Sequence, residues 1–147
     1  MDTIDIALRL SAAGLAGVAT GLNRDLHGKP TGVRTLGLVG VGAALAVLAV
    51  TGTGSADTSR VIQGILTGIG FLGVGVIVRN NEGHQVHGLT TAACVWVTAS
   101  IAVACAVAEW RTVLISAPLV FVILVFGGSF EKAVHRRWPG TRTPDPS

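Results

Sequence analysis

An uncharged stretch of eighteen residues, VIQGILTGIGFLGVGVIV, separates Arg60 from Arg79 and limits the folds that are open to this chain. As an α-helix it would be about 27 Å long, close to the hydrocarbon thickness of a bilayer. Glycine disfavours a helix in water by about 1 kcal/mol relative to alanine, but in lipid a small residue lets two helix backbones approach closely. The stretch therefore predicts a transmembrane helix.

The glycines of this helix fall on two nearly opposite faces of a wheel with about 100° per residue. One face holds Gly64, Gly68 and Gly75, and the other holds Gly70 and Gly73 together with Gln63. A helix with small residues on two faces is expected to sit between neighbours rather than against lipid. We therefore expect it to be the buried centre of a helix bundle, with the five glycines as packing residues.

The composition supports a membrane protein. Only 13% of the 147 residues are charged and 50% are hydrophobic, whereas a soluble domain carries about 25% charged residues. A chain of this length has room for one domain. The net charge of +3 predicts no nucleic-acid partner, because the basic residues lie mostly in short linkers and the tail, where they set membrane orientation.

Five apolar runs divide the chain, at about Ile4–Leu22, Thr35–Val50, Val61–Val78, Leu89–Ala108 and Thr112–Phe126. Short linkers join them, so consecutive helices are expected to be antiparallel and adjacent. The sequence predicts an all-α, polytopic membrane bundle of about five transmembrane helices. Residues 1–130 form its membrane domain, and residues 131–147 form a basic, partly disordered cytoplasmic tail.

The basic residues predict an orientation with the N-terminus outside and the C-terminus in the cytoplasm. This orientation places eight of them inside: Arg24, Lys29, Arg34, Arg79, Lys132, Arg136, Arg137 and Arg142. It leaves only Arg9, Arg60 and Arg111 on the far side.

Several charged residues allow a structural and a functional interpretation. Arg34 opens the second run, and a guanidinium beside hydrocarbon needs a partner, for which Asp25 is a candidate. Asp57 is better explained as a helix cap than as part of a cation entrance, since a lone carboxylate is a weak magnesium site. The charged first linker is either a solvated turn or a docking surface for anionic headgroups or an acidic partner.

Little in the chain predicts catalysis or a cofactor. His84 and His87 have zinc-like spacing, but they flank a glycine-containing loop without an evident fourth ligand, so we expect no metal. Cys94 and Cys105 are interpreted as small packing residues. No nucleophile with a base and no phosphate-binding loop is evident, so an enzyme is not expected.

Three segments together resemble a known family. GLNRDLHGKPTGVRTLGLV, DTSRVIQGILTGIGFLGVGVIVR and GLTTAACVWVTA are similar, in this order, to the MgtC/SapB family of bacterial inner-membrane proteins, and the likeness extends over about residues 4–126. The chain departs from the residues usual in this family at three positions. Members carry Glu, Ala and Ala where this chain has Asn23, Thr31 and Val74. Loss of the Glu removes a counter-charge for Arg24 or Arg34. A soluble ACT-type domain that many members append is not expected here.

The resemblance implies a multi-pass protein of the bacterial inner membrane, with a role in adaptation to low magnesium and, in pathogens, in survival inside macrophages. It also implies action by binding other membrane proteins, including the F-type ATP synthase and nutrient-transport machinery. Separately from the resemblance, a homo-oligomer is a further option for the partner. The positions it marks as functionally sensitive are Arg24, Arg34, Thr35, Asp57, Arg60, Gln63, Arg79, Thr90 and Thr91. A transporter or channel for magnesium or another small solute is the alternative, and it would need a polar pathway.

Overall fold

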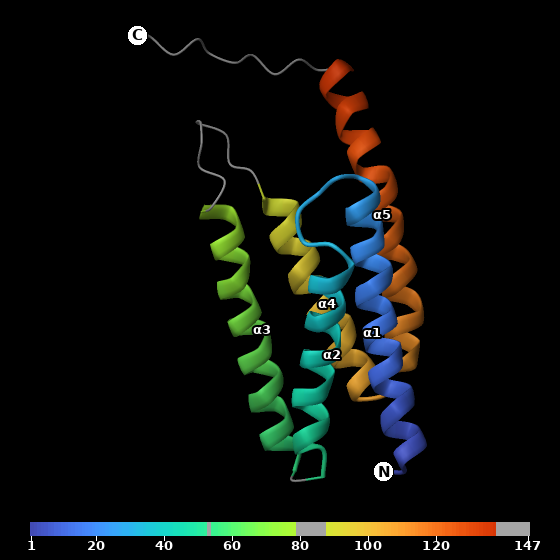
Figure 1. Ribbon diagram of the computed structural model, residues 1–147, viewed down its shortest axis with the longest axis vertical. Coiled ribbons are helices and arrows are strands. Elements are labelled where there is room, and N and C mark those ends of the chain that lie inside the picture. The colour runs from blue at the N-terminus through green and yellow to red at the C-terminus, as the bar shows by residue number, and fades with distance from the viewer. Residues whose placement is uncertain (53, 79–87, 138–147) are drawn as a thin grey trace.

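The computed structural model describes residues 1–52, 54–78 and 88–137, and within them the chain forms five helices and no strand. The helices are α1 (Thr3–Leu26), α2 (Val33–Val50), α3 (Ser55–Val78), α4 (Leu89–Ala106) and α5 (Trp110–Arg137). All five are long and apolar enough to cross a membrane, and they lie side by side (Figure 1). The prediction of an all-α membrane bundle with five spans is confirmed.

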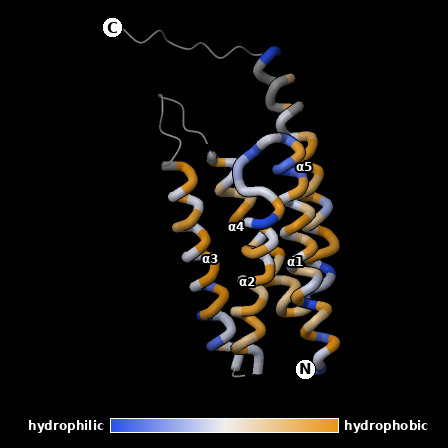
Figure 2. The backbone as a smooth tube through the Cα atoms, viewed as in Figure 1, coloured by the Kyte–Doolittle hydropathy of each residue, from blue (hydrophilic) through white to orange (hydrophobic). Residues whose placement is uncertain are grey.

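The surface of the bundle suits a bilayer. Hydrophobic residues extend along most of each helix, and hydrophilic residues gather toward the two ends (Figure 2). Large apolar side chains such as Phe71, Leu114 and Phe126 point outward and are exposed. Lipid can cover these side chains, and the helices satisfy their own backbone groups, as a spanning structure requires.

A glycine ends α1 and turns the chain toward α2. Gly28 has a φ of +60°, a left-handed conformation that glycine adopts without the cost of a Cβ atom. The amide of Lys29 donates to the carbonyl of Arg24 at 3.0 Å, and the amide of Gly28 donates to that of Asp25 at 3.1 Å. These two bonds form a Schellman motif, which fixes the end of α1.

The central helix is α4, so the prediction that the glycine-rich third helix occupies the centre is wrong. In the membrane-spanning window of α4, 56% of the residues are buried, against 6% in that of α3. α4 contacts the four other helices, whereas α3 lies at the edge of the bundle against α4 and part of α2 (Figure 1). The inward face of α4 carries alanine, threonine, cysteine and valine, which are small enough for close approach and still fill the space between helices.

Glycine-mediated packing occurs mainly between α1 and α2, and of the five α3 glycines predicted to pack, Gly73 alone closely approaches a neighbouring helix. A Cβ atom on Gly17 would lie 2.3 Å from the carbonyl oxygen of Leu36, and one on Gly40 would lie 2.5 Å from that of Ala13. A Cβ on Gly73 would meet that of Ala92 at 3.2 Å. By contrast, a Cβ would meet nothing within 4 Å at the other four glycines predicted to pack in this chain, Gly64, Gly68, Gly70 and Gly75.

The last helix is longer than the sequence indicated. α5 continues to Arg137, so residues 131–137 extend the helix into the segment expected to be a tail. Its membrane-spanning window, Trp110–Gly128, contains no buried residue, so this helix is open to lipid. Pro118 lies inside this helix. The predicted disordered end, residues 138–147, lies outside the described residues.

Candidate functional site

A buried arginine lies where α1, the α1–α2 linker and α4 meet. Arg24 occupies the last turn of α1, and only 4% of its surface is exposed. The position favours a cation electrostatically, since the carbonyl groups at a helix C-terminus carry partial negative charge. A charged group buried in a membrane protein nevertheless needs more than this, and it usually marks a functional site.

The Arg24 guanidinium has neutral oxygen partners. One terminal nitrogen, Nη2, donates to the hydroxyl of Thr91 at the start of α4 and, at 3.2 Å, to the carbonyl of Pro30 in the linker. Its Nε is buried without a hydrogen-bond partner. Among the described side chains no carboxylate forms an ion pair with Arg24, so its positive charge is held by dipoles alone.

The carboxylate of Asp25, next in the chain, does not pair with an arginine but bonds the backbone. Asp25 accepts a hydrogen bond from the backbone amide of Val33 at 2.9 Å and so caps the start of α2. Gly32 leaves room for this contact, since a Cβ there would lie 1.7 Å from a carboxylate oxygen of Asp25. The predicted pairing of Asp25 with Arg34 is therefore wrong, and Asp25 instead holds the linker that presents the Pro30 carbonyl to Arg24.

A polar seam continues from Arg24 along α4. Thr91, Cys94 and Thr98 are buried and spaced three and four residues apart, so they share the face of α4 that meets α1. Cys94 lies beside the Arg24 guanidinium. The hydroxyl oxygen of Thr98 is buried without a partner. The side chains of this seam are buried, which suits positioning of α1 against α4 better than access for a solute.

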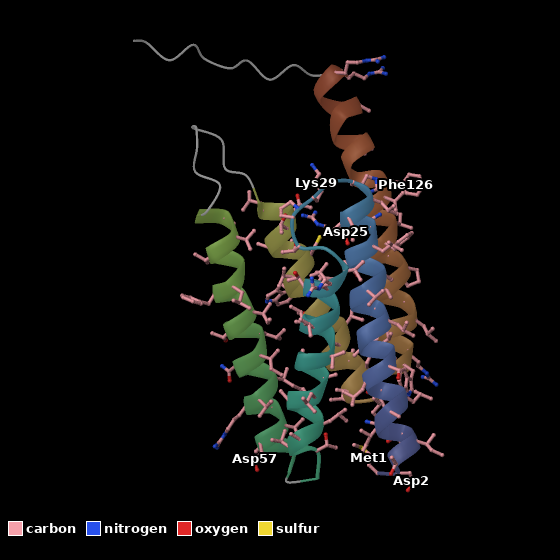
Figure 3. The ribbon with its side chains drawn as sticks, viewed as in Figure 1. Met1, Asp2, Asp25, Lys29, Asp57 and Phe126 are labelled. Carbon is pink, nitrogen blue, oxygen red and sulfur yellow. The ribbon has the colours of Figure 1, made fainter. Side chains whose placement is uncertain are left out.

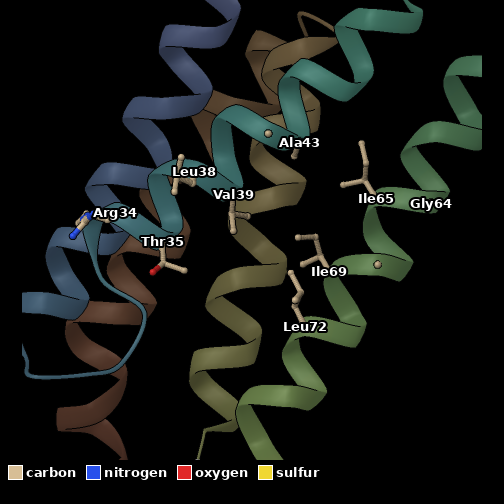
Figure 4. A pocket seen from close by; sticks show the side chains of 11 residues that line it. Arg34, Thr35, Leu38, Val39, Ala43, Gly64, Ile65, Ile69 and Leu72 are labelled. Carbon is tan, nitrogen blue, oxygen red and sulfur yellow. The ribbon is translucent and has the colours of Figure 1, made fainter.

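Arg34 and Thr35 are placed elsewhere, at the end of an open groove between α2 and α3 (Figure 4). Both side chains are exposed, and neither forms a hydrogen bond or ion pair with a described residue. The groove has a volume of about 760 Å³ and becomes apolar beyond these two residues. Two of the predicted packing glycines, Gly64 and Gly68, line it from α3.

Gln63 lies on a third surface, the outward face of α3. Its side chain and that of Thr67, one turn further on, are exposed and have no hydrogen-bond partner among the described residues. They line a shallow hollow of about 510 Å³ with Ser59, Ile62 and Leu66. This places polar groups near the middle of a helix that crosses the hydrocarbon.

The opposite end of the bundle carries Asp57 and Arg60, both exposed. Figure 3 shows Asp57 at the same end as Met1 and Asp2, far from Lys29 and Asp25. The helix α3 begins at Ser55, so Asp57 lies in its first turn, where the carboxylate complements the helix dipole. Its side chain forms no capping hydrogen bond with a described residue. The expectation that it precedes α3 as a cap is wrong.

The remaining predicted residues divide between the surface and the undescribed loop. Thr90 is exposed beside the buried Thr91. Arg79, His84 and His87 lie outside the described residues. Within the described ranges, no group of three or more His, Cys, Asp or Glu side chains could hold a metal ion.

Sequence reasoning missed two parts of this arrangement. The Pro30 carbonyl could not be found from the chain, because a backbone acceptor carries no sequence signal. The α1–α2 contact could have been found, since Ala13, Gly17 and Gly21 follow one another at intervals of four residues and form a small-residue face. Another contact joins the far ends of α1 and α4, where Arg9 donates a hydrogen bond to the carbonyl of Ala106 at 2.7 Å and forms an ion pair with Asp5 at 2.9 Å.

A five-helix apolar bundle with a buried cation at one end defines a polytopic membrane protein. The model of the MgtC family matches residues 10–133, so the chain belongs to the MgtC family of multi-pass proteins of the bacterial inner membrane. The resemblance drawn from the sequence is thereby confirmed.

Three relatives illustrate the match. SrpB of Synechococcus elongatus is 34% identical over 150 aligned positions, which cover 93% of this chain and 81% of SrpB. MgtC of Salmonella typhimurium LT2 is 41% identical over 107 positions, 73% of this chain and 46% of MgtC. YhiD of Escherichia coli K12 is 39% identical over 109 positions, 67% of this chain and 49% of YhiD. The match thus spans about half the length of MgtC and YhiD, and no solved structure matches the chain.

Proposed function

We propose that this chain is a membrane-embedded regulatory protein, without catalytic activity, that acts by binding other membrane proteins during adaptation to low magnesium. In a pathogen the same role would contribute to virulence. Membership of the MgtC family supports the proposal, and the name of YhiD, which provisionally describes a magnesium transporter, supports the link to magnesium. Partners such as the F-type ATP synthase or transport machinery, and the membrane domain at residues 1–130, belong to the same proposal.

The observation that carries this proposal is the unpartnered pair Gln63 and Thr67 on the outward face of α3. An amide in hydrocarbon without a hydrogen bond is costly. A polar residue on a partner helix would satisfy it, and such interhelical bonds contribute about 1–2 kcal/mol in model peptides. Gly70 lies on the same side one turn further, where nothing lies within 4 Å of an added Cβ, so a partner backbone could approach.

Transport of magnesium or another small solute is the second candidate, and the hollow beside Gln63 favours it. Ser59, Gln63 and Thr67 place three polar side chains along one side of α3 within the span. A second copy facing this hollow could close it into a polar path. The buried Arg24 disfavours a divalent cation near the other end of the bundle, because like charges repel.

Growth tests whether the Gln63 face is needed for either function, and a flux measurement then separates the two functions. In a strain lacking the gene, wild type should restore growth at limiting magnesium, and Gln63→Leu should fail to do so at equal membrane abundance. Gln63→Asn, which keeps the amide, and Leu114→Ala, which changes an exposed side chain of α5, serve as controls. Full growth with Gln63→Leu would contradict partner binding through this face.

The second measurement is magnesium flux into liposomes that contain the purified protein. The regulatory proposal expects no more flux than in empty vesicles. Robust flux that Asp57→Ala abolishes would instead establish transport, with Asp57 acting at the outer end of the bundle.

A further inference from the structure

We propose that the groove between α2 and α3 binds an anionic phospholipid, with one acyl chain in the apolar part and the phosphate held by Arg34 and Thr35. This groove lies on a different side of α3 from Gln63 and Thr67, so the proposal does not rest on partner binding.

The shape of the groove suits an acyl chain. It extends along α2 from Arg34 to Ala43, nine residues or about 14 Å of helix. Its volume of about 760 Å³ falls within the range of about 300–1,000 Å³ for small-molecule sites. Beyond Thr35 its walls are made of aliphatic side chains and glycine, including Val39, Ile69 and Leu72 (Figure 4).

Glycines on both walls account for the width of the groove. Gly42 of α2 and Gly64 and Gly68 of α3 line it, and an added Cβ would meet no atom within 4 Å at any of the three. They therefore leave space between the helices instead of bringing them into contact. In a bilayer this space opens sideways to lipid, because the groove is open along its length.

The polar end of the groove offers free hydrogen-bond donors. The guanidinium of Arg34 can bond two phosphate oxygens at once. The hydroxyl of Thr35 has no partner among the described residues, whereas those of Thr20, Thr51 and Thr58 bond the carbonyl four residues earlier. These donors lie at the boundary of the hydrocarbon and the apolar part of the groove lies deeper. A phospholipid has the same arrangement, because its phosphate lies at the boundary and its acyl chains lie in the hydrocarbon.

Charge favours an anionic lipid over a second copy of this chain. Arg34 lies in the first turn of α2, directly after the linker that carries Lys29, and anionic headgroups are attracted to a surface with these two cations (Figure 3). A two-fold dimer through this groove, with its axis along the membrane normal, would place the two copies of Arg34 at the same level. Like charges would then face each other.

Native mass spectrometry tests the proposal on the purified full chain in micelles that contain equal amounts of phosphatidylglycerol and phosphatidylcholine with identical acyl chains. Wild type should retain phosphatidylglycerol preferentially. Arg34→Gln should lower this preference about fivefold, the effect of one basic residue near an anionic membrane surface. Gly68→Leu should reduce retention of both lipids, because its side chain fills the groove.

Two matched variants serve as controls. Arg60→Gln removes an exposed arginine of α3 at the opposite end of the bundle, and Gly75→Leu adds the same side chain at an open glycine outside the groove. Both should retain lipid as wild type does. Equal retention of the two lipids by wild type, an unchanged preference in Arg34→Gln, or a lipid-free dimer that Gly68→Leu converts to monomer would overturn the proposal.

Discussion

The guanidinium of Arg24 donates a hydrogen bond to the hydroxyl of Thr91, which lies 67 positions further along the chain. This bond joins the last turn of the first helix to the first turn of the central one. With the Pro30 carbonyl as its second acceptor, Arg24 connects α1, the linker to α2, and α4 at one point. Its Nε is buried without a hydrogen-bond partner, so the guanidinium depends on both of the acceptors that it has, the Thr91 hydroxyl and the Pro30 carbonyl.

Removal of the Thr91 hydroxyl should destabilise the bundle. In Thr91→Val the buried guanidinium loses an acceptor, and the loss should lower the free energy of unfolding by about 1–3 kcal/mol. The cost should nearly vanish when Arg24 is replaced by Met, because no buried charge then needs the acceptor. Thermal unfolding of the two single variants and the double variant in detergent measures this coupling.

Thr90→Val is the control for this experiment, since Thr90 is exposed beside Thr91 and forms no hydrogen bond with a described residue. It should leave the melting temperature unchanged. Additive effects of Thr91→Val and Arg24→Met would show that the two side chains are not energetically coupled.

The contrast between two glycines gives a second prediction. Gly17→Ala should destabilise the protein by about 3 kcal/mol, at the upper end of overpacking effects, because its Cβ would meet the Leu36 backbone at 2.3 Å. Gly68→Ala should leave stability unchanged or raise it by up to about 1 kcal/mol, since nothing lies near the added methyl group. Melting temperatures by fluorescence-detected size exclusion decide the order, and a larger loss for Gly68→Ala would contradict the edge position of α3.

The end of α4 provides a stabilising substitution. Ala108 has a φ of +60°, and its amide donates to the Cys105 carbonyl while the Glu109 amide donates to that of Ala104. These bonds form a Schellman motif in which the left-handed position is occupied by alanine, at a cost of about 1–2 kcal/mol. Ala108→Gly should therefore raise the free energy of unfolding by about 1 kcal/mol. Ala106→Gly, inside the helix, should lower it by about the same amount, and equal shifts in one direction would contradict the motif.

Orientation in the membrane remains a prediction from the basic residues, and the structure makes it testable at two exposed positions. In a chain with Cys94 and Cys105 replaced by Ala, a thiol reagent that cannot cross the membrane should label Asp57→Cys in intact cells. Lys29→Cys should be labelled only after the membrane is permeabilised, since Lys29 lies at the other end of the bundle (Figure 3). The reverse pattern would place the N-terminus in the cytoplasm.

Sequence patterns predicted the parts of the fold that depend on local composition. Long uncharged runs bounded by Arg60, Arg79 and similar residues fix the helices, because lipid admits only segments that satisfy their own backbone. The ion pair of Asp5 with Arg9 is likewise local, because the two residues are one turn apart on the same helix. The candidate site was only partly predictable: Arg24 and Thr91 were both marked, but nothing in the chain indicated that they bond each other.

The sequence by itself determined that this chain is a five-span membrane protein of the MgtC family, since apolar length and a set of local motifs suffice for both. Only the tertiary structure decided which helix is central and which glycines touch a neighbour. Small residues permit close approach but do not choose a partner. That choice depends on how all five helix surfaces fill space together, which places Gly17 against α2 and leaves Gly68 open.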